Sequence, residues 1–214
     1  MGTVVFDFDS TLIDCESLDE LLARVLAGQP ERIAEVAAIT VAGMEGRLAF
    51  EESLRRRLAI ARPTRAAVEA FGRDAVAMLT PGMEALVLGL QAEVWIVSGA
   101  LRETVLPAAA RLGVPEHRVL ATQVAWSETD DDATLERVTE CRTKVEHLGP
   151  LSAGWARPRV MVGDGITDHA PHAAGLVDHF VAFTAVVRRA PVVATGAPEA
   201  ATVPELEYLL GQWL

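Results

Sequence analysis

The sequence predicts an α/β protein, with a parallel sheet as the middle of three layers and a helical bundle inserted after the first strand. From Pro81 onward, apolar runs of strand length alternate with helical patterns, which is typical of a parallel sheet with helices on both faces. Between Thr11 and Pro81 only helical patterns occur. The length of 214 residues is ample for a hydrophobic core with an inserted lobe.

The first predicted strand, residues 4–6, leads directly into Asp7 and Asp9. In an extended chain this spacing places both carboxylates on one side. A buried strand that ends in acids is typical of the carboxyl edge of a parallel sheet, where α/β proteins bind ligands. One acid could then be a nucleophile or metal ligand and the other a general acid/base. The alternative is a plain strand before a helix capped by Asp9 or Ser10, and this pair alone does not decide between them.

The inserted segment predicts four short helices. Ser17, with an acid three residues later, begins the first, and Gly28 ends it. Pro30 suits the first turn of the second helix, which Gly43 and Gly46 interrupt. Apolar residues at helical spacing define the others. The expected helices are 17–27, 30–41, 50–60 and 64–79.

The second part of the chain predicts the alternation of strands and helices. Expected strands lie at 94–97, 119–122, 159–162 and 180–183, and expected helices at 83–91, 101–112 and from about 133 to 148, after an exposed turn at 127–132. Chemically distinctive loops follow three of the strands, at 7–11, 98–100 and 163–168. Because parallel strands end at one edge of a sheet, these loops should meet there.

Charge and composition restrict the possible functions. The formal charge of −11, from 30 acids against 19 Lys and Arg, argues against a general nucleic-acid binder. It does not exclude an anionic substrate, because the local field governs a site. The two cysteines, Cys15 and Cys141, are too few for a disulfide framework and indicate a reducing compartment. With neither a signal peptide nor an apolar stretch that could span a bilayer, we expect a cytoplasmic protein without membrane association.

Together the loops contain the groups that phosphoryl transfer requires. Asp7 and Asp9 face Asp164 and Asp168 across the expected sheet edge, and such carboxylates can hold a metal. Ser98-Gly99, at an expected strand-to-helix turn, offers a hydroxyl and the free amides of a helix N-terminus for phosphate. Lys144 adds a compact positive charge. Each group alone fits a cap, a turn or a solvated residue. Those ordinary roles do not explain why each strand ends in such a residue.

Four of these segments resemble the motifs of the haloacid dehalogenase superfamily. They are Asp7-Phe8-Asp9-Ser10-Thr11, Ser98, Lys144 and Gly163-Asp164-Gly165-Ile166-Thr167-Asp168, in that order. Glu16 and the segment 44–57 further resemble the cap segment of phosphoserine phosphatases. The resemblance covers nearly the whole chain. It implies a Rossmann-like core of residues 1–13 and 80–214 with a helical cap of residues 14–79.

The resemblance also implies the chemistry. Asp7 would attack phosphorus to give an aspartyl-phosphate, and Asp9 would protonate the leaving alkoxide and then activate water. One Mg²⁺ would be held by side-chain oxygens of Asp7 and Asp164 and by the backbone carbonyl of Asp9. Thr167 and Asp168 would support this cluster from a second layer.

Phosphate and substrate sites follow from the same resemblance. Ser98, Gly99 and Lys144 would hold phosphate. Glu16 would meet the substrate ammonium, Arg57 its carboxylate, and Met44 and Phe50 would form apolar walls. The implied reaction is hydrolysis of O-phospho-L-serine in L-serine biosynthesis. The expected partner is a small phosphomonoester, with neither nucleic acid nor membrane, and the oligomeric state is left open.

Some alternatives remain open at this stage. Arg142 competes with Lys144, because the segment 122–142 matches the family poorly and only spacing selects the lysine. His169 and His172 could be metal ligands, although Mg²⁺ prefers oxygen. The same core could act on another small phosphate or transfer phosphate to an alcohol. A catalytically silent binding protein is a further alternative, but it has no need of both Asp7 and Asp9.

Overall fold

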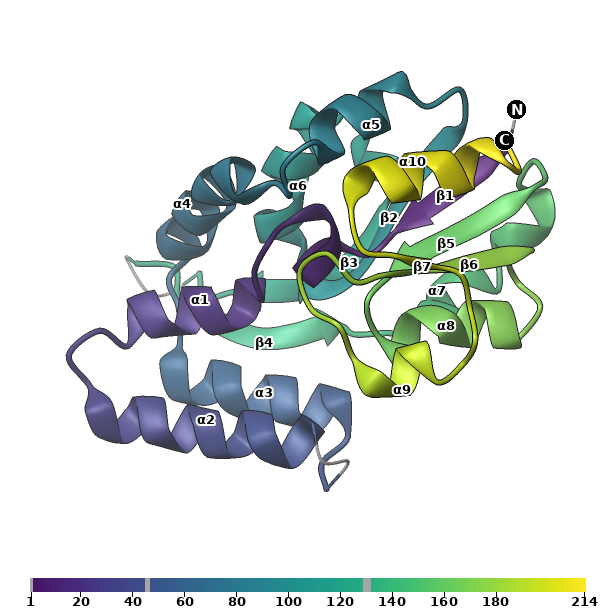
Figure 1. Cartoon of the computed structure of the whole chain (residues 1–214). Coiled ribbons are helices and arrows are strands. Elements are labelled where there is room, and N and C mark those ends of the chain that lie inside the picture. Colours follow the sequence, from purple (N-terminus) through teal and green to yellow (C-terminus); the bar gives the residue numbers. More distant parts are fainter. Residues whose placement is uncertain (1, 45–46, 129–131) are drawn as a thin grey trace.

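The computed structural model describes residues 2–44, 47–128 and 132–214, without the side chains of Gly43 and Met44. Gly46 and part of the turn expected at 127–132 therefore lie outside the described residues. The expected α/β fold is confirmed: the described strands form one seven-stranded sheet in the order β4-β3-β2-β1-β5-β6-β7 (Figure 1). All pairings are parallel except that of β3 with β4. The strands are β1 (Thr3–Phe6), β2 (Glu93–Leu101), β3 (Val119–Trp126), β4 (Leu135–Glu140), β5 (Arg159–Gly163), β6 (His179–Phe183) and β7 (Glu199–Ala200).

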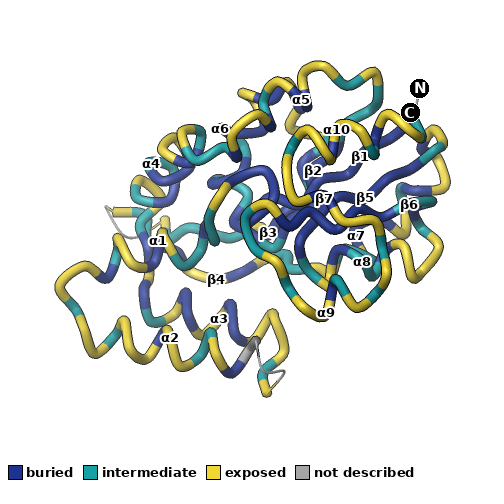
Figure 2. Tube along the Cα trace, in the orientation of Figure 1, coloured by how far each residue is buried: buried dark blue, intermediate teal, exposed yellow. Residues whose placement is uncertain are grey.

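Helices cover both faces of the sheet, because its strands are apolar on both sides. Val4 and Phe6 of β1 enter one hydrophobic cluster, and Val5 between them enters the other. The first cluster includes residues of α5 (Met83–Gly89), α6 (Arg102–Arg111) and α10 (Val203–Gly211). The second includes residues of α7 (Lys144–Leu148) and α9 (Ala190–Val193), and α8 (Ile166–Ala173) packs on β5 and β6 beside them. The sheet is consequently the buried middle layer (Figure 2).

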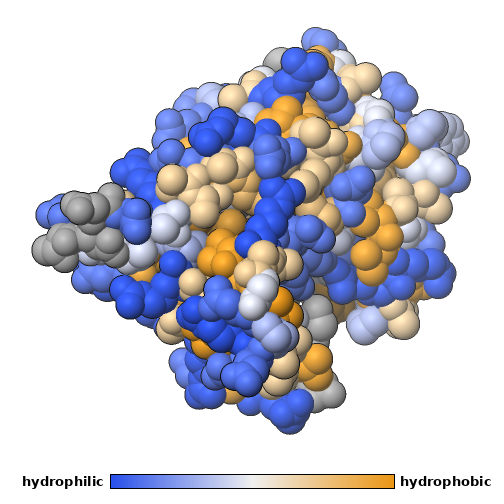
Figure 3. Space-filling view, turned by 90° about the vertical axis from the view of Figure 1, so that its left-hand side faces the viewer, coloured by the Kyte–Doolittle hydropathy of each residue, from blue (hydrophilic) through white to orange (hydrophobic). Residues whose placement is uncertain are grey.

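The segment after β1 is helical, as expected, and projects to one side of the sheet (Figure 1). Its helices are α1 (Ser17–Val25), α2 (Pro30–Met44), α3 (Phe50–Ala61) and α4 (Arg65–Ala75). Hydrophobic and hydrophilic patches alternate on this side of the surface (Figure 3). Its apolar core is shared with the rest of the chain, because Leu101, Leu135 and Val138 join the same cluster and α4 packs against α6. The exact boundaries of a 14–79 cap stay a prediction.

The helix expected from about 133 to 148 is wrong over most of its length. Residues 135–140 form β4, which pairs antiparallel with β3, and only α7 at the end is helical. The side chains of Leu135 and Val138 are buried against α1, α3 and α4, so tertiary packing overrides the local helical pattern. The same hairpin extends β3 to Trp126, beyond the expected end at 122.

The strand expected to stop at Ser98 continues to Leu101. The register between β2 and β3 shifts between Val97 and Leu101, so residues 98–100 form a bulge, and α6 begins only at Arg102. The expectation that Ser98 and Gly99 lie at a helix N-terminus is therefore wrong. They lie instead on an irregular strand end beside β1.

No helix in the three described ranges is long and apolar enough to cross a bilayer.

Candidate active site

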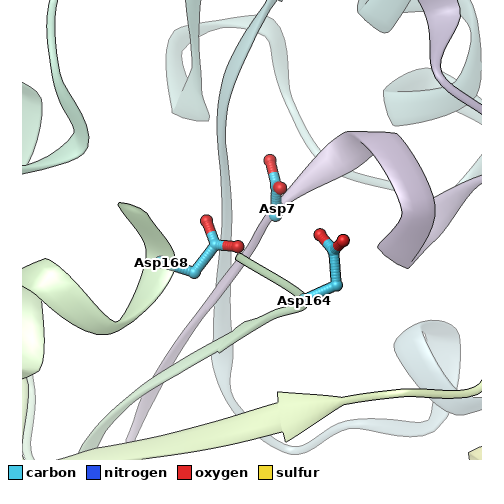
Figure 4. A group of neighbouring side chains, drawn as sticks. All are labelled: Asp7, Asp164 and Asp168. Atoms are coloured by element: carbon cyan, nitrogen blue, oxygen red, sulfur yellow. The ribbon is translucent and has the colours of Figure 1, made fainter. Parts of the chain in front are cut away.

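Three buried carboxylates meet where β1 and β5 end. Oxygens of Asp7, Asp164 and Asp168 lie within 4.8 Å of one another (Figure 4). Asp7 follows β1, Asp164 follows β5, and Asp168 lies in the first turn of α8. The loops that the sequence places at one sheet edge thus converge on a single acidic cluster.

A wide turn after β1 separates the two acids of the first motif. Asp7 caps this turn by accepting the backbone N–H of Phe8 at 2.7 Å. Ser10 has a left-handed backbone, with φ of 51°. The chain then returns so that Asp9 Oδ1 accepts the Ser17 N–H at 2.9 Å, at the start of α1. Asp7 consequently belongs to the acidic cluster, while Asp9 is hydrogen-bonded to the first inserted helix.

Lys144 is the only lysine in the chain, against eighteen arginines. Its Nζ lies 2.6 Å from Asp7 Oδ1 and also donates to Asp168 Oδ1. A capping box between Thr143 and Glu146 fixes the start of α7 and so directs this side chain into the site. Arg142 is half-exposed and pairs with Glu140 at 3.2 Å, outside the cluster. The structure therefore places Lys144, and not Arg142, among the acids.

Burial and mutual repulsion raise the pKa values of the site carboxyls. Burial raises the pKa of Asp7 well above its usual value, and the negative charge of Asp168 adds to this. The pKa of Asp9 rises to about 7, mainly through burial. Burial also raises the pKa of Asp164 to about 6, although a hydrogen bond from Arg189 opposes the change. For Lys144, burial favours the neutral amine, but Asp168 and Asp7 outweigh it and raise its pKa.

Glycines beside Asp168 allow its side chain to lie against the backbone. A Cβ on Gly163 would come within 2.3 Å of the Asp168 carboxyl carbon. The Gly165 N–H donates to Asp168 Oδ2 at 2.7 Å, while Lys144 uses Oδ1. Both oxygens of Asp168 are therefore engaged within the protein.

The hydrogen bonds leave a specific pair of oxygens available in the cluster. No described residue donates to Asp7 Oδ2 or to Asp164 Oδ1, whereas the other oxygens of these acids have partners. Hard oxygen donors of this kind suit a divalent cation such as Mg²⁺. The residues present thus fit a metal ion, with Asp168 acting as a support for its neighbours.

The loop at the end of β2 contacts an inserted helix. Ser98 is buried, and its Oγ accepts the Ala100 N–H at 3.0 Å. A Cβ on Gly99 would lie 2.7 Å from Cζ of Phe50, so glycine lets this ring approach the loop. Phe50 is otherwise exposed and begins α3. The sequence-predicted phosphate loop and one predicted substrate wall therefore touch. The side chain of Met44, the other wall, lies outside the described residues.

The two residues predicted to bind the substrate's charges have protein partners. Arg57 is buried in α3; its Nη1 donates to Asp19 Oδ1 at 3.2 Å and lies 3.4 Å from Thr40 Oγ1. Glu16 Oε1 accepts from Ser10 Oγ at 2.8 Å. Burial lowers the pKa of Arg57, and the negative charges of Asp19 and, to a smaller extent, Glu16 oppose this change.

Arg189 is a site residue that the sequence reasoning missed. It lies on the loop between β6 and α9, at the same sheet edge. Its Nε donates to Asp164 Oδ2 at 2.6 Å and its Nη2 to Glu16 Oε1 at 2.8 Å. The available signal was the Arg188-Arg189 pair shortly after a predicted strand, in a loop that had no assigned role.

The remaining candidates lie at the edge of the site. Thr167 is exposed in the first turn of α8. The rings of His169 and His172 lie 5.5 Å apart, and His169 packs edge-on against Phe180 at 5.3 Å. Neither histidine belongs to the cluster of ligand-type side chains in the part of the chain that is described.

Residues 4–170 match the haloacid dehalogenase-like hydrolase family. This match spans the acids, Lys144 and the glycine loop in their observed arrangement. The chain belongs to the haloacid dehalogenase-like hydrolases. The resemblance seen in the sequence is thereby confirmed.

Within this family the chain is similar to phosphoserine phosphatases. It is 30% identical to the chloroplastic enzyme of Arabidopsis thaliana over 198 residues, which cover 89% of this chain and 65% of that protein. It is 32% identical to the enzyme of Rattus norvegicus, over 88% of this chain and 84% of the relative. A phosphoserine phosphohydrolase-like protein from Francisella tularensis has the same fold, with a TM-score of 0.87 and 32% identity over 98% and 99% of the two chains. The chain is therefore a phosphatase-type hydrolase.

Proposed function

We propose that this hydrolase converts O-phospho-L-serine and water into L-serine and phosphate, through an aspartyl-phosphate on Asp7, with Mg²⁺ as cofactor. The observation that carries the proposal is the acidic cluster with its single lysine. It lies in a chain that is 30–32% identical to named phosphoserine phosphatases. This hydrolysis of O-phospho-L-serine would form L-serine and would therefore be a step of L-serine biosynthesis.

Two free carboxylate oxygens support the metal assignment. Asp7 Oδ2 and Asp164 Oδ1, with the backbone carbonyl of Asp9, would hold Mg²⁺, and Asp168 would orient Lys144 beside them. When bound, the cation would neutralise charge on the phosphoryl oxygens. Without it, the three acids have Lys144 and Arg189 as their cationic partners among the described residues, which leaves negative charge to repel a phosphate dianion.

The two acids of the first motif would divide the chemistry. A carboxylate oxygen of Asp7 would attack phosphorus, and the P–O bond to the serine oxygen would break. Asp9 would give its proton to that leaving oxygen and later take one from the water that hydrolyses the aspartyl-phosphate. A pKa of about 7 suits this role, because an acid/base near neutrality can both give and accept a proton. Ser98, Gly99 and Lys144 would hold the phosphoryl oxygens.

The zwitterionic end of phosphoserine fits the charges on the inserted helices. The substrate carboxylate would replace Asp19 as the partner of Arg57. A guanidinium can make two parallel hydrogen bonds with a carboxylate. The ammonium would meet Glu16, and Phe50 together with Met44 would cover the apolar stem. Thr167, at the exposed edge of α8, would support the metal side of the site.

Phosphate release from a panel of phosphomonoesters tests this proposal. The panel contains phosphoserine, phosphoethanolamine and glycerol phosphate, each assayed in chelator, in Mg²⁺ and in Ca²⁺. We expect phosphoserine to be hydrolysed in Mg²⁺ only, because Ca²⁺ prefers larger and looser coordination. Full activity in chelator would overturn the mechanism. Activity on another ester alone would indicate a different small phosphate as the substrate. Release that depends on an acceptor alcohol would indicate a transferase, and no release at all would indicate a binding protein.

We also propose a cytoplasmic location. Cys15 and Cys141 are both free thiols in the structure, as a reducing compartment would keep them.

A further inference from the structure

One guanidinium, that of Arg189, joins the metal side of the site to its substrate side. It donates through Nε to Asp164 and through Nη2 to Glu16. The Asp164 side chain is 5% exposed and that of Arg189 is 35% exposed, so Arg189 reaches inward from the rim onto a buried acid. A guanidinium reaches two carboxylates through separate nitrogens, here Nε and Nη2, whereas a lysine has a single donor nitrogen.

Both acids that Arg189 holds are needed by other cations in the proposed reaction. Asp164 would bind the divalent metal, and Glu16 would bind the substrate ammonium. Glu16 Oε1 already accepts from Ser10 Oγ, whose backbone is fixed by the left-handed turn at that residue. The orientation of Glu16 is therefore held from both sides before a substrate arrives.

The loop between β6 and α9 does not need Arg189 as an anchor. The neighbouring Arg188 already ties this loop to β7, with Nε and Nη2 donating to the two oxygens of Glu199 at 2.8 and 3.1 Å. The hydroxyl of Thr184 also donates to Glu199. Arg188 thus serves as the structural partner of the pair and as a matched control.

We propose that Arg189 is a displaceable positioning residue that takes the place of two cations, the divalent metal at Asp164 and the substrate ammonium at Glu16. This inference rests on the function proposed above. In the ligand-free protein Arg189 pairs with both acids and holds them in position. A metal on Oδ1 of Asp164 would repel the guanidinium on Oδ2 of the same carboxylate and loosen that contact, and the remaining half-exposed pair of Arg189 with Glu16 is weak. Glu16 then exchanges Arg189 for the ammonium more readily.

Such an arrangement couples the two binding events. The metal and the ammonium each add a positive charge to one of the two carboxylates that Arg189 holds and so weaken that anchor, and each thereby lowers the cost of binding the other. Coupling of this kind is reciprocal, because both ligands draw on the same equilibrium.

Calorimetric titration with Mg²⁺ alone, in the absence of substrate, tests the metal half of the proposal. Arg189→Met should bind Mg²⁺ about tenfold more tightly than the unmutated protein, the size of one charge-assisted hydrogen bond. Arg188→Met should bind Mg²⁺ unchanged. Equal or weaker affinity in Arg189→Met would overturn the proposal. If that variant does not fold, Arg189→Lys, which replaces two donor nitrogens by one, should also bind Mg²⁺ more tightly.

The same titration with L-serine present tests the substrate half. L-Serine supplies the ammonium without a phosphate, so it should tighten Mg²⁺ binding in the unmutated protein and have no such effect in Arg189→Met. Absence of any L-serine effect on the unmutated protein would refute the coupling. The phosphate-release panel uses a separate readout, so failure of the proposed substrate would be recognised independently of these affinities.

Discussion

Replacing the only lysine of the chain should destabilise the fold as well as remove activity. In Lys144→Met two acids lose their shared counter-ion, and their side chains are 12% (Asp7) and 1% (Asp168) exposed. Removing one partner of a buried ion pair costs about 3–5 kcal/mol. For a chain of this size each kcal/mol lowers Tm by about 2–4 °C, so we expect a fall of about 6–20 °C.

The loss of stability in Lys144→Met should increase as the pH rises. Because the pKa of Asp7 in the folded protein lies above its unfolded value, the folded state binds a proton that the unfolded chain has released. Stability contributed by this group therefore falls as pH rises through the window between the two pKa values. Lys144 lowers the pKa of Asp7, so its removal raises that pKa further. The deficit of Lys144→Met should be larger at pH 8 than at pH 5.

Thermal unfolding in chelator, followed by circular dichroism at several pH values, measures this effect. Chelator excludes divalent cations that could neutralise the acids. Arg142→Met is the control, because the exposed pair with Glu140 should contribute at most about 1 kcal/mol. Equal midpoints for the two variants would refute the view that Lys144 is the buried counter-ion of the site.

Three further substitutions test the roles of single residues. Asp7→Asn should abolish steady-state phosphate release while circular dichroism shows a folded protein, because an amide cannot form the aspartyl-phosphate; substantial turnover would exclude the covalent mechanism. Asp9→Asn should slow single-turnover ester cleavage by about 10²–10⁴-fold through loss of general acid catalysis, and unchanged cleavage would contradict that role. Gly99→Ala should raise KM for phosphoserine, because its Cβ would meet the ring of Phe50 at 2.7 Å; an unchanged KM would show that this contact is not needed.

Much of the site could be predicted because its residues follow strands. Asp7, Asp164 and Asp168 converge since parallel strands end at one edge, and this follows from strand order alone. Spacing to the last motif favoured Lys144 over Arg142, but spacing alone could not show which side chain enters the site. The position of the Lys144 side chain depends on where α7 begins, and Thr143 fixes that start by capping the helix.

Features that depend on tertiary contacts could not be predicted from the sequence. Residues 135–140 were expected to be helical, and they form a strand because Leu135 and Val138 pack against the inserted helices. The bulge that carries Ser98 depends on the register of β2 with β3. Arg189 was missed because its partners are 25 and 173 residues away along the chain. No local pattern reveals such a bridge.

The preference for phosphoserine tests the central claim most directly. We would measure kcat/KM in Mg²⁺ for phosphoserine and for phosphoethanolamine, which lacks the carboxylate that Arg57 is proposed to bind. The unmutated enzyme should prefer phosphoserine, and Arg57→Ala should remove that preference by weakening phosphoserine by about 2–5 kcal/mol, as expected for a buried charge pair. Arg55→Ala should leave the preference intact, because its exposed side chain pairs with Glu51 one turn away. Equal efficiency on the two esters in the unmutated enzyme would contradict the assignment and leave a phosphatase for another substrate.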